Sequence, residues 1–227
     1  MAKNQAKIKI HAFIQARQTS TRLPNKIFLK LNELTILENI YLRLKNSKIL
    51  DNIFFIIPSN SKNLKLKKFL KKKNYPIFCG SEMNVLKRFY KASEKFKTDV
   101  IVRITADCPL VDYRLIDSML KKFLKYKKVD YLSNTLKRSF PDGLDIEIFS
   151  KNVLKIAFRK ASKNYDLEHV TPYIKRNFES MNFLNNKNLS KLRWTLDTIQ
   201  DYNKLNKMFL KNKIKPDLSW KKILNKV

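Results

Sequence analysis

Glycine, cysteine and histidine are scarce in this sequence, with two residues of each among 227. Because a glycine-rich segment is missing, the chain carries neither a G-x-x-x-x-G-K-S/T phosphate-binding loop nor a G-x-G-x-x-G dinucleotide-binding turn. Cys79 and Cys108 are too few for a disulfide framework, which favours a reducing, cytosolic compartment. With two histidines we find no cysteine–histidine nucleophile pair, so we expect Cys108 to be a small packed residue.

Long apolar runs are missing as well. No run approaches the roughly 20 residues that a helix needs to cross a bilayer. The basic residues 1–7 precede an apolar run at 8–14 that is too short for a signal peptide. We therefore expect a cytoplasmic protein that does not insert into a membrane.

Acidic residues are few: 19 Asp and Glu stand against 49 Lys and Arg, a net charge of +30 at pH 7. Such a charge is typical of proteins that bind nucleic acids. Here, however, the lysines are spread over the polar faces of every predicted helix, as at 67–73 and 121–128. We therefore expect no specific nucleic-acid partner and only weak, salt-sensitive binding to nucleic acids in general.

Apolar runs alternate with helical patterns along the first part of the chain, and 227 residues suffice for one sizeable core. This alternation predicts an α/β fold with a doubly wound, mainly parallel sheet. Ligands of such sheets bind in the crevice at the carboxyl ends of the strands. We expect strands at 8–14, 53–57, 76–78, 100–104 and 129–132, and helices at 35–48, 61–73, 85–96 and 113–126.

After Gly143 the regular alternation stops. We expect strands at 144–149 and 193–196, and helices at 151–163, 167–177, 199–211 and 220–227. Neither a repeat nor a long linker divides the chain. The sequence therefore predicts a single domain, 1–227, in which residues 135–190 form an inserted lobe for substrate binding or dimerisation.

The segment 16–26, ARQTSTRLPNK, follows the first predicted strand. It brings Arg17, Arg22 and Lys26 into one short loop with three hydroxyl side chains. Arginine matches paired phosphate oxygens, lysine adds a mobile charge, and loop N–H groups and hydroxyls fill further acceptor sites. The segment therefore predicts a triphosphate-binding loop, and the alternative is a solvated basic loop.

The same segment resembles the ARxxSTRLPGK loop of the 3-deoxy-manno-octulosonate and acylneuraminate cytidylyltransferases. Further motifs follow in order over nearly the whole chain, and they resemble above all the branch of spore-coat polysaccharide biosynthesis protein F. They are CGSEMNVLKRF (79–89), RITADCPL (103–110), SNT (133–135), FPDGLDIE (140–147), EHVTPY (168–173) and RWTLDT (193–198). The sequence thus resembles the sugar-activating cytidylyltransferases, which implies a nucleotide-diphospho-sugar transferase fold of the GT-A-like type.

Three positions depart from these motifs: Asn25 replaces a glycine, Cys79 an arginine and Asn84 an aspartate. Asparagine tolerates a positive φ better than most residues, so the turn at Asn25 can persist. We expect the changes at Cys79 and Asn84 to affect base or substrate preference more than the fold.

Asp107 and Asp197 each follow a predicted strand. Mg²⁺ is usually held by one or two carboxylates together with phosphate oxygens, and the resemblance implies that these two aspartates are the metal ligands. The alternative is that each is a turn or capping residue. For Asp197 the alternative is a cap on the helix from Ile199, with Thr198 as a second candidate for that cap.

The resemblance implies attack by an acceptor oxygen on the α-phosphate of CTP, with Mg²⁺ as cofactor and pyrophosphate as leaving group. The product would be a CMP- or CDP-activated sugar for surface polysaccharide or glycan biosynthesis. The catalytic candidates are Arg22, Lys26 and Asp107. The nucleotide-binding candidates are Gln15, Ala16, Arg17, Ser20, Thr21, Arg22, Lys26, Gly80, Ser81, Val85, Arg88, Thr105 and Ala106.

A small sugar-like acceptor is expected against the inserted lobe, and we expect a homodimer. The acceptor candidates are Asn134, Asp142, Asp145, Glu147, Glu168 and His169. Acidic residues suit sugar hydroxyls, but in so basic a chain each could instead pair with a lysine. His169 is either a general base or a structural residue. Arg103 and Arg193 could meet an acidic acceptor or pair with Asp107 and Asp197.

Other functions stay open on sequence grounds. The same fold could use another nucleoside triphosphate, or a sugar-phosphate or phosphonate acceptor. The chain could also be a non-catalytic nucleotide-binding module, or a basic nucleic-acid-binding protein without specific dependence on a nucleoside triphosphate.

Overall fold

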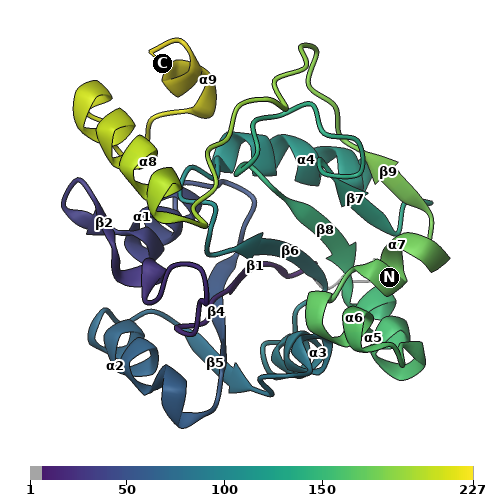
Figure 1. The fold of residues 1–227 in the computed structure, drawn as a ribbon. Helices are drawn as coiled ribbons and strands as arrows, with labels where there is room; N and C mark the ends of the chain where they lie inside the picture. Colours follow the sequence, from purple (N-terminus) through teal and green to yellow (C-terminus); the bar gives the residue numbers. More distant parts are fainter. Residues whose placement is uncertain (1–6, 227) are drawn as a thin grey trace.

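The computed structural model describes residues 7–226. Residues 1–6, within the basic N-terminal segment, and residue 227, at the end of the last predicted helix, lie outside the described range. A seven-stranded sheet of order β5-β4-β1-β6-β8-β7-β9 forms the centre of the molecule (Figure 1). Its strands are β1 (Ile10–Gln15), β4 (Asn52–Pro58), β5 (Ile77–Gly80), β6 (Val100–Thr105), β7 (Tyr131–Ser133), β8 (Glu147–Ser150) and β9 (Ser180–Asn182).

Strand β8 is antiparallel to both of its neighbours, and the other pairings in this sheet are parallel. The helices are α1 (Ile36–Leu44), α2 (Leu64–Lys72), α3 (Val85–Lys95), α4 (Tyr113–Lys125), α5 (Lys151–Lys160), α6 (Asn164–His169), α7 (Pro172–Asn177), α8 (Ile199–Asn212) and α9 (Trp220–Leu224). Short elements complete the chain: the 3₁₀ turns η1 (Lys26–Phe28) and η2 (Ser61–Asn63), and the hairpin β2 (Lys30–Leu31) and β3 (Leu34–Thr35). The predicted α/β fold with a mainly parallel sheet is confirmed.

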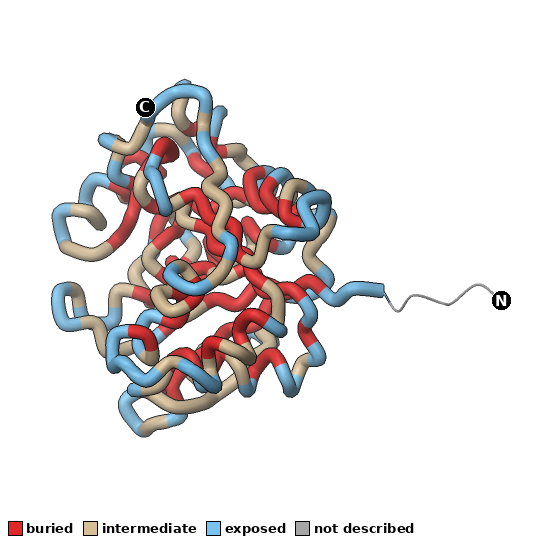
Figure 2. Tube along the Cα trace, turned by 90° about the vertical axis from the view of Figure 1, so that its right-hand side faces the viewer, coloured by how far each residue is buried: buried red, intermediate tan, exposed pale blue. Residues whose placement is uncertain are grey.

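Side chains of β1 alternate between two hydrophobic cores, one on each face of the sheet. Ala12 and Ile14 pack into the core covered by α1, α2, α4 and α8, whereas Phe13 packs into the core covered by α3, α5 and α7. Buried residues accordingly concentrate in the central strands and exposed ones on the outer helix faces and loops (Figure 2). Within residues 7–226 the structure has no helix both long and apolar enough to span a membrane.

Arg43 ties the C-terminal segment to this framework. Its guanidinium is fully buried and donates to the carbonyl oxygens of Val111, Lys215 and Leu218. Burial lowers the pKa of Arg43 to about 10, so the side chain stays protonated at neutral pH. Asp112 adds a second link, because it caps α4 and also accepts from the backbone N–H of Trp220 (2.6 Å).

Two predicted elements after Gly143 are wrong. The helix expected at 167–177 breaks at Val170, which has φ 70° and ψ −55°. The Thr171 N–H donates to the His169 carbonyl (2.8 Å) and closes a γ-turn, and Pro172 then begins α7. The strand expected at 193–196 is a single bridge between Asp142 and Arg193.

Residues 135–190 contribute β8 and β9 to the central sheet, and their helices α5 and α7 cover one face of it. The segment is therefore built into the main domain rather than set beside it. Its expected role in acceptor binding or dimerisation stays a prediction.

Gly143 allows two distant backbone segments to touch. Its φ is +108°, and a Cβ at this position would lie 2.5 Å from the carbonyl carbon of Trp194. Next to this contact, the Trp194 N–H donates to the Asp142 carbonyl (2.6 Å). The glycine is needed both for its backbone angle and for the missing side chain.

Gly143→Ala is therefore expected to lower the free energy of unfolding by about 2–4 kcal/mol, because it adds backbone strain to a steric clash. Urea unfolding followed by circular dichroism measures the change. Gly80→Ala is the control with a smaller expected loss, because its new Cβ would meet side-chain atoms of Arg88 and Phe78 rather than backbone. Equal unfolding midpoints for wild type and Gly143→Ala would contradict this explanation.

Candidate active site

A cleft of about 330 Å³ opens at the carboxyl edge of the sheet, where β1, β4 and β6 end. Its walls come from the loop after β1, the ends of β4 and β6, the start of α3, the end of α6 and the residue before the cap of α8. The lining residues are Gln15, Ala16, Arg17, Ser20, Thr21, Arg22, Lys26, Ile27, Pro58, Glu82, Met83, Val85, Arg88, Thr105, Ala106, Asp107, Glu168, His169 and Asp197.

Most of the expected nucleotide-binding residues line this cleft. Gly80 and Ser81 do not, because the side chain of Arg88 lies against both. The Arg88 guanidinium donates to the Ser81 carbonyl. A Cβ on Gly80 would lie 2.9 Å from Cγ of Arg88, so Arg88 packs directly against the glycine. These two residues therefore support a wall of the cleft from behind.

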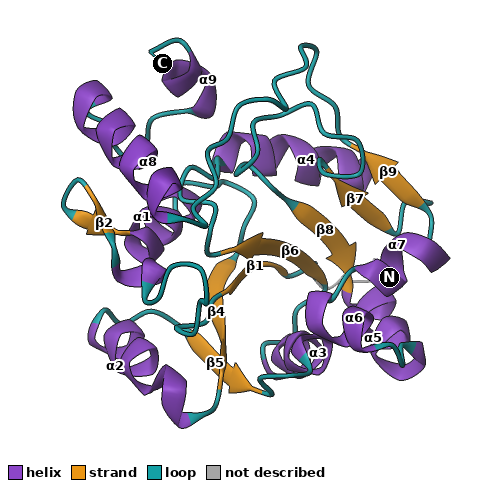
Figure 3. Cartoon of the chain, in the orientation of Figure 1, coloured by secondary structure: helices purple, strands orange, loops and turns teal. Residues whose placement is uncertain are grey.

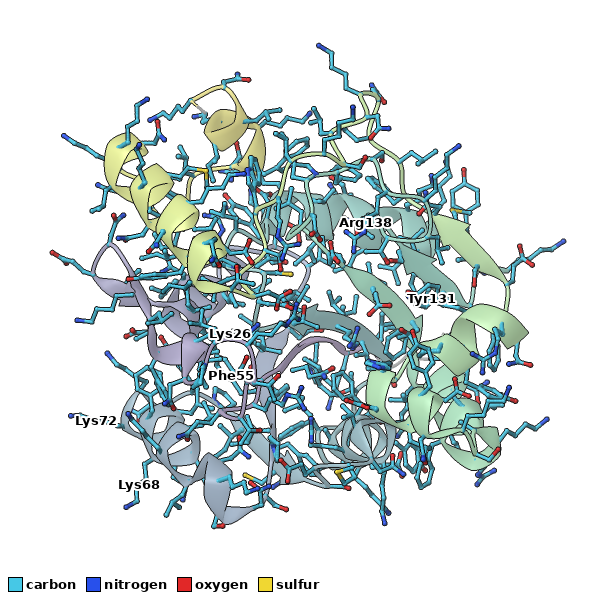
Figure 4. All side chains as sticks on the ribbon, viewed as in Figure 1. Lys26, Phe55, Lys68, Lys72, Tyr131 and Arg138 are labelled. Atoms are coloured by element: carbon cyan, nitrogen blue, oxygen red, sulfur yellow. The ribbon has the colours of Figure 1, made fainter. Side chains whose placement is uncertain are left out.

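The loop after β1 turns at Asn25, whose φ is 57°. The expected left-handed turn is thus retained with asparagine in place of glycine. Directly after it, the Lys26 ammonium donates to Asp197 Oδ1 (2.9 Å) and to the Leu196 carbonyl (2.7 Å). Arg22 also pairs with Asp197 (3.3 Å). Figure 4 shows Lys26 close to the centre of the molecule.

Backbone contacts bring Asp197 to Asp107. The Leu196 N–H donates to the Asp107 carbonyl (2.8 Å), and the Thr195 hydroxyl reaches the same oxygen (3.2 Å). The carboxylate of Asp107 accepts from the Thr105 hydroxyl through Oδ1. Among residues 7–226 its Oδ2 has no hydrogen-bond partner, and no Lys or Arg forms an ion pair with it.

The donor set fits a magnesium ion that is completed by its ligand. In the described range no group of three or more His, Cys, Asp or Glu residues could hold a metal alone. Two neighbouring carboxylates with phosphate oxygens are a usual environment for Mg²⁺. The alternative that Asp197 caps α8 is wrong, because Thr198 is the cap and accepts from the Asp201 N–H.

Arg103 and Arg193 have different partners. Arg193 pairs with Asp201 (2.8 Å), Asp142 (3.0 Å) and Asp197 (3.6 Å). The pairing of Arg193 with Asp197, one of the two alternatives expected from the sequence, is therefore present. Arg103 does not pair with Asp107; it donates to Glu147 and Gln15 instead.

A second pocket of about 220 Å³ adjoins the cleft and shares Thr105 and His169 with it. Among the acceptor candidates, Asp145, Glu147 and His169 line this pocket, and Glu168 lines the cleft. The other residues that line the second pocket are Arg103, Thr135, Arg138, Tyr165, Thr171, Pro172 and Lys175.

Two acceptor candidates line neither pocket. Asn134 is buried; its amide nitrogen donates to the Leu144 carbonyl (2.7 Å), and its amide oxygen accepts from the Ile146 N–H (2.9 Å). Asp142 is engaged by Arg193 and Arg138. Their positions in this structure fit a role in holding the chain together.

Glu147 is buried at the base of the second pocket and remains charged. Burial alone would raise the pKa of this carboxyl, but Arg103, Lys175 (3.0 Å) and the hydroxyls of Tyr131 and Thr171 outweigh it. Together they lower the pKa of Glu147 to about 2.

The second pocket has a surplus of positive charge. Arg138 makes a two-pronged pair with Asp145 (2.8 and 2.7 Å), and Arg103 and Lys175 share the single charge of Glu147. Three cationic side chains therefore face two carboxylates in the lining.

The γ-turn at Val170 lies where the two pockets meet. Val170 is fully buried, and a β-branched residue at positive φ is a strained conformation. His169 on one side of it lines both pockets, and Thr171 on the other side donates to Glu147 (2.8 Å). The strained turn thus sets the positions of two residues that line the site.

Several lining residues are not among the site candidates expected from the sequence. Glu82 and Met83 occupy variable positions of the 79–89 motif, and Arg138 and Lys175 are two basic residues among 49. In the structure each of these two pairs with a carboxylate that lines the second pocket, Arg138 with Asp145 and Lys175 with Glu147.

Comparisons with known proteins agree with this architecture. A family model described as cytidylyltransferase matches residues 11–217. Spore coat polysaccharide biosynthesis protein SpsF of Bacillus subtilis is 31% identical over 217 residues, which cover 91% of this chain and 88% of SpsF. The structure of a cytidylyltransferase from Leptospira borgpetersenii is 33% identical, with a TM-score of 0.91 over 96% of this chain and 93% of its own.

CMP:2-keto-3-deoxy-manno-octonic acid synthetase, solved in complex with CTP, shares the fold at 12% identity, with a TM-score of 0.71 over 90% of this chain and 99% of its own. The family match spans most of the chain and agrees with the two relatives of higher identity. This chain is a nucleotidyltransferase and belongs to the cytidylyltransferase family.

Proposed function

We propose that this protein transfers a cytidylyl group from CTP to a sugar-like acceptor and releases pyrophosphate. The observation that carries the proposal is the grouping of Asp107, Asp197, Lys26 and Arg22 in one cleft that opens onto a second polar pocket. The CTP bound in the fold relative and the family match support the choice of nucleotide.

The basic loop after β1 would hold the triphosphate. Arg17, Arg22 and Lys26 supply charge-assisted donors, and the hydroxyls of Ser20 and Thr21 line the same wall. Asp107 and Asp197 would hold Mg²⁺, which when bound neutralises phosphate charge and favours departure of pyrophosphate. The protein's contribution is then mainly positioning and electrostatic stabilisation.

The second pocket would hold the acceptor. A hydroxyl oxygen of the acceptor would form the new bond to the α-phosphorus of CTP, while the bond from that phosphorus to the pyrophosphate oxygen breaks. His169 lines both pockets and is the group able to accept the proton of the acceptor hydroxyl. The surplus cation among Arg103, Arg138 and Lys175 favours an acceptor that carries a negative group.

The proposal extends to surface polysaccharide or glycan assembly, supported by the likeness to SpsF. It includes a homodimer and a cytosolic location, the latter supported by the two free thiols, Cys79 and Cys108. Incubation with each of the four nucleoside triphosphates, Mg²⁺ and a panel of sugar acids, sugar phosphates and phosphonates, read by mass spectrometry, tests it. A cytidylylated product supports the proposal, and a product with another nucleotide alone overturns the assignment of CTP.

Asp107→Asn is expected to abolish nearly all pyrophosphate release, because it removes a charged oxygen ligand and little volume. The rate is measured with CTP, Mg²⁺ and the acceptor found in the screen, and the fold is checked by thermal unfolding. Asp217→Asn, which removes the same charge from an exposed loop, should keep normal turnover. Full activity of Asp107→Asn, or of wild type in excess chelator, would contradict the metal assignment.

Lys26→Ala and Arg22→Ala are each expected to weaken CTP binding by about 1.5–3 kcal/mol, the usual contribution of a hydrogen bond to a charged group. Isothermal titration in Mg²⁺ measures the affinity. Lys68→Ala is the control, because Lys68 lies exposed on α2 at the outer edge of the molecule, as does Lys72 (Figure 4). Unchanged affinity in both loop variants would show that the loop does not hold the triphosphate.

The net charge of +30 is expected to give only weak, sequence-indifferent binding to DNA and RNA. Such binding rests on scattered phosphate contacts and weakens with a slope of about −0.9 per contact in log–log salt plots. Fluorescence anisotropy with labelled duplexes should show it fading by about 0.2 M salt. Tight, sequence-selective binding at that salt would favour a nucleic-acid function instead.

A further inference from the structure

The turn between β5 and α3 brings one more carboxylate into the cleft. Glu82 lines it together with Met83, Val85 and Arg88 from the same turn and helix, and Pro58 from the end of β4. Figure 3 shows this turn between β5 and α3 in the lower part of the view, with the start of α8 well above it. This wall, formed by Pro58, Glu82, Met83, Val85 and Arg88, is termed the β5–α3 wall.

A chain of side-chain hydrogen bonds fixes Glu82. The Asn60 amide donates to Glu82 Oε2, and the buried Asn63 donates to Asn60 Oδ1 (2.6 Å). Asn63 in turn accepts from the backbone N–H of Gln18 (2.7 Å), within the basic loop. These hydrogen bonds fix the position of the Glu82 carboxylate relative to the loop that would bind the triphosphate.

The second oxygen of Glu82 is free to accept from a ligand. Over the described part of the chain, Oε1 has no hydrogen-bond partner and Glu82 forms no ion pair. Because Glu82 lines the cleft, this oxygen is in a position to accept a hydrogen bond from a bound ligand.

Arg88 places a donor in the same wall. Its side chain is 3% exposed, and its Nε has no partner in residues 7–226. Burial, and then Arg17, lower the pKa of Arg88 to about 10, so it stays protonated at neutral pH. The β5–α3 wall thus places the free oxygen of Glu82 beside the apolar surfaces of Pro58, Met83 and Val85, with the buried Arg88 guanidinium in the same wall.

This pattern matches one pyrimidine better than the other. Cytosine offers an amino donor at C4, whereas uracil offers a carbonyl acceptor at the same position. We infer that Glu82 Oε1 accepts a hydrogen bond from the 4-amino group of CTP and thereby discriminates against UTP. The inference rests on the proposed function and names the residue that selects its nucleotide.

The departures at Asn84 and Cys79 agree with this assignment. Asn84 Oδ1 accepts from the Lys87 N–H (2.7 Å) and caps α3, so it serves the helix rather than a ligand. Cys79 lies in β5 and does not line the cleft. Glu82 is thus the sole carboxylate of this turn.

Isothermal titration of CTP and UTP, each with Mg²⁺, tests the inference without an acceptor. Wild type is expected to prefer CTP, and Glu82→Gln to reduce the ratio of the two dissociation constants about tenfold or more, because glutamine can also donate to the uracil carbonyl. Asn60→Ala keeps the carboxylate but removes the group that fixes it, so a smaller reduction is expected. Glu179→Gln removes an equal charge at an exposed position outside the cleft and should leave the ratio unchanged.

The outcomes separate the two levels of the argument. An unchanged ratio in Glu82→Gln, or equal affinities of wild type for CTP and UTP, would overturn the role of Glu82 and leave nucleotidyl transfer standing. Failure of wild type to bind either nucleotide would overturn the proposed function itself.

Discussion

The charged site depends on one backbone contact, the docking of residues 192–197 against the end of β6. The segment forms no ladder with the sheet; it is held by the Leu196 N–H on the Asp107 carbonyl and by the Trp194 N–H on the Asp142 carbonyl. Gly143 makes room for that approach. The Thr195 hydroxyl on the Asp107 carbonyl and the Lys26 ammonium on the Leu196 carbonyl reinforce this docking, which brings Asp107 and Asp197 into one cleft.

The small number of acidic residues determines where ion pairs form in this structure. In so basic a chain, the position of each carboxylate decides which cations become ordered. Asp197 forms ion pairs with Lys26, Arg22 and Arg193, and Glu147 forms ion pairs with Arg103 and Lys175. Many other lysines, such as Lys68, Lys71 and Lys72 on α2, are exposed and form no ion pair among residues 7–226, which is why total charge says little about function here.

Strongly patterned parts of the fold could be predicted from sequence. The apolar runs of β1, β4 and β6 identify buried parallel strands, so the cleft at their carboxyl ends follows from topology. Other parts depend on tertiary contacts. The helical pattern of 167–177 does not reveal that burial of Val170 and the start of a helix at Pro172 outweigh backbone strain. Likewise, the sequence pattern does not show that Arg138 pairs with Asp145 beside the second pocket, or that Asn60 holds Glu82 in the cleft.

The γ-turn at Val170 has a mechanical consequence. Only Val170 and Thr171 separate α6 from α7, so a shift of one helix is transmitted directly to the other. The imidazole that borders the cleft and the hydroxyl that holds the buried glutamate are therefore parts of one stiff corner. Free-energy linkage is reciprocal: if a ligand in the cleft changes the affinity of the second pocket through this corner, a ligand in the second pocket changes the affinity of the cleft by the same factor.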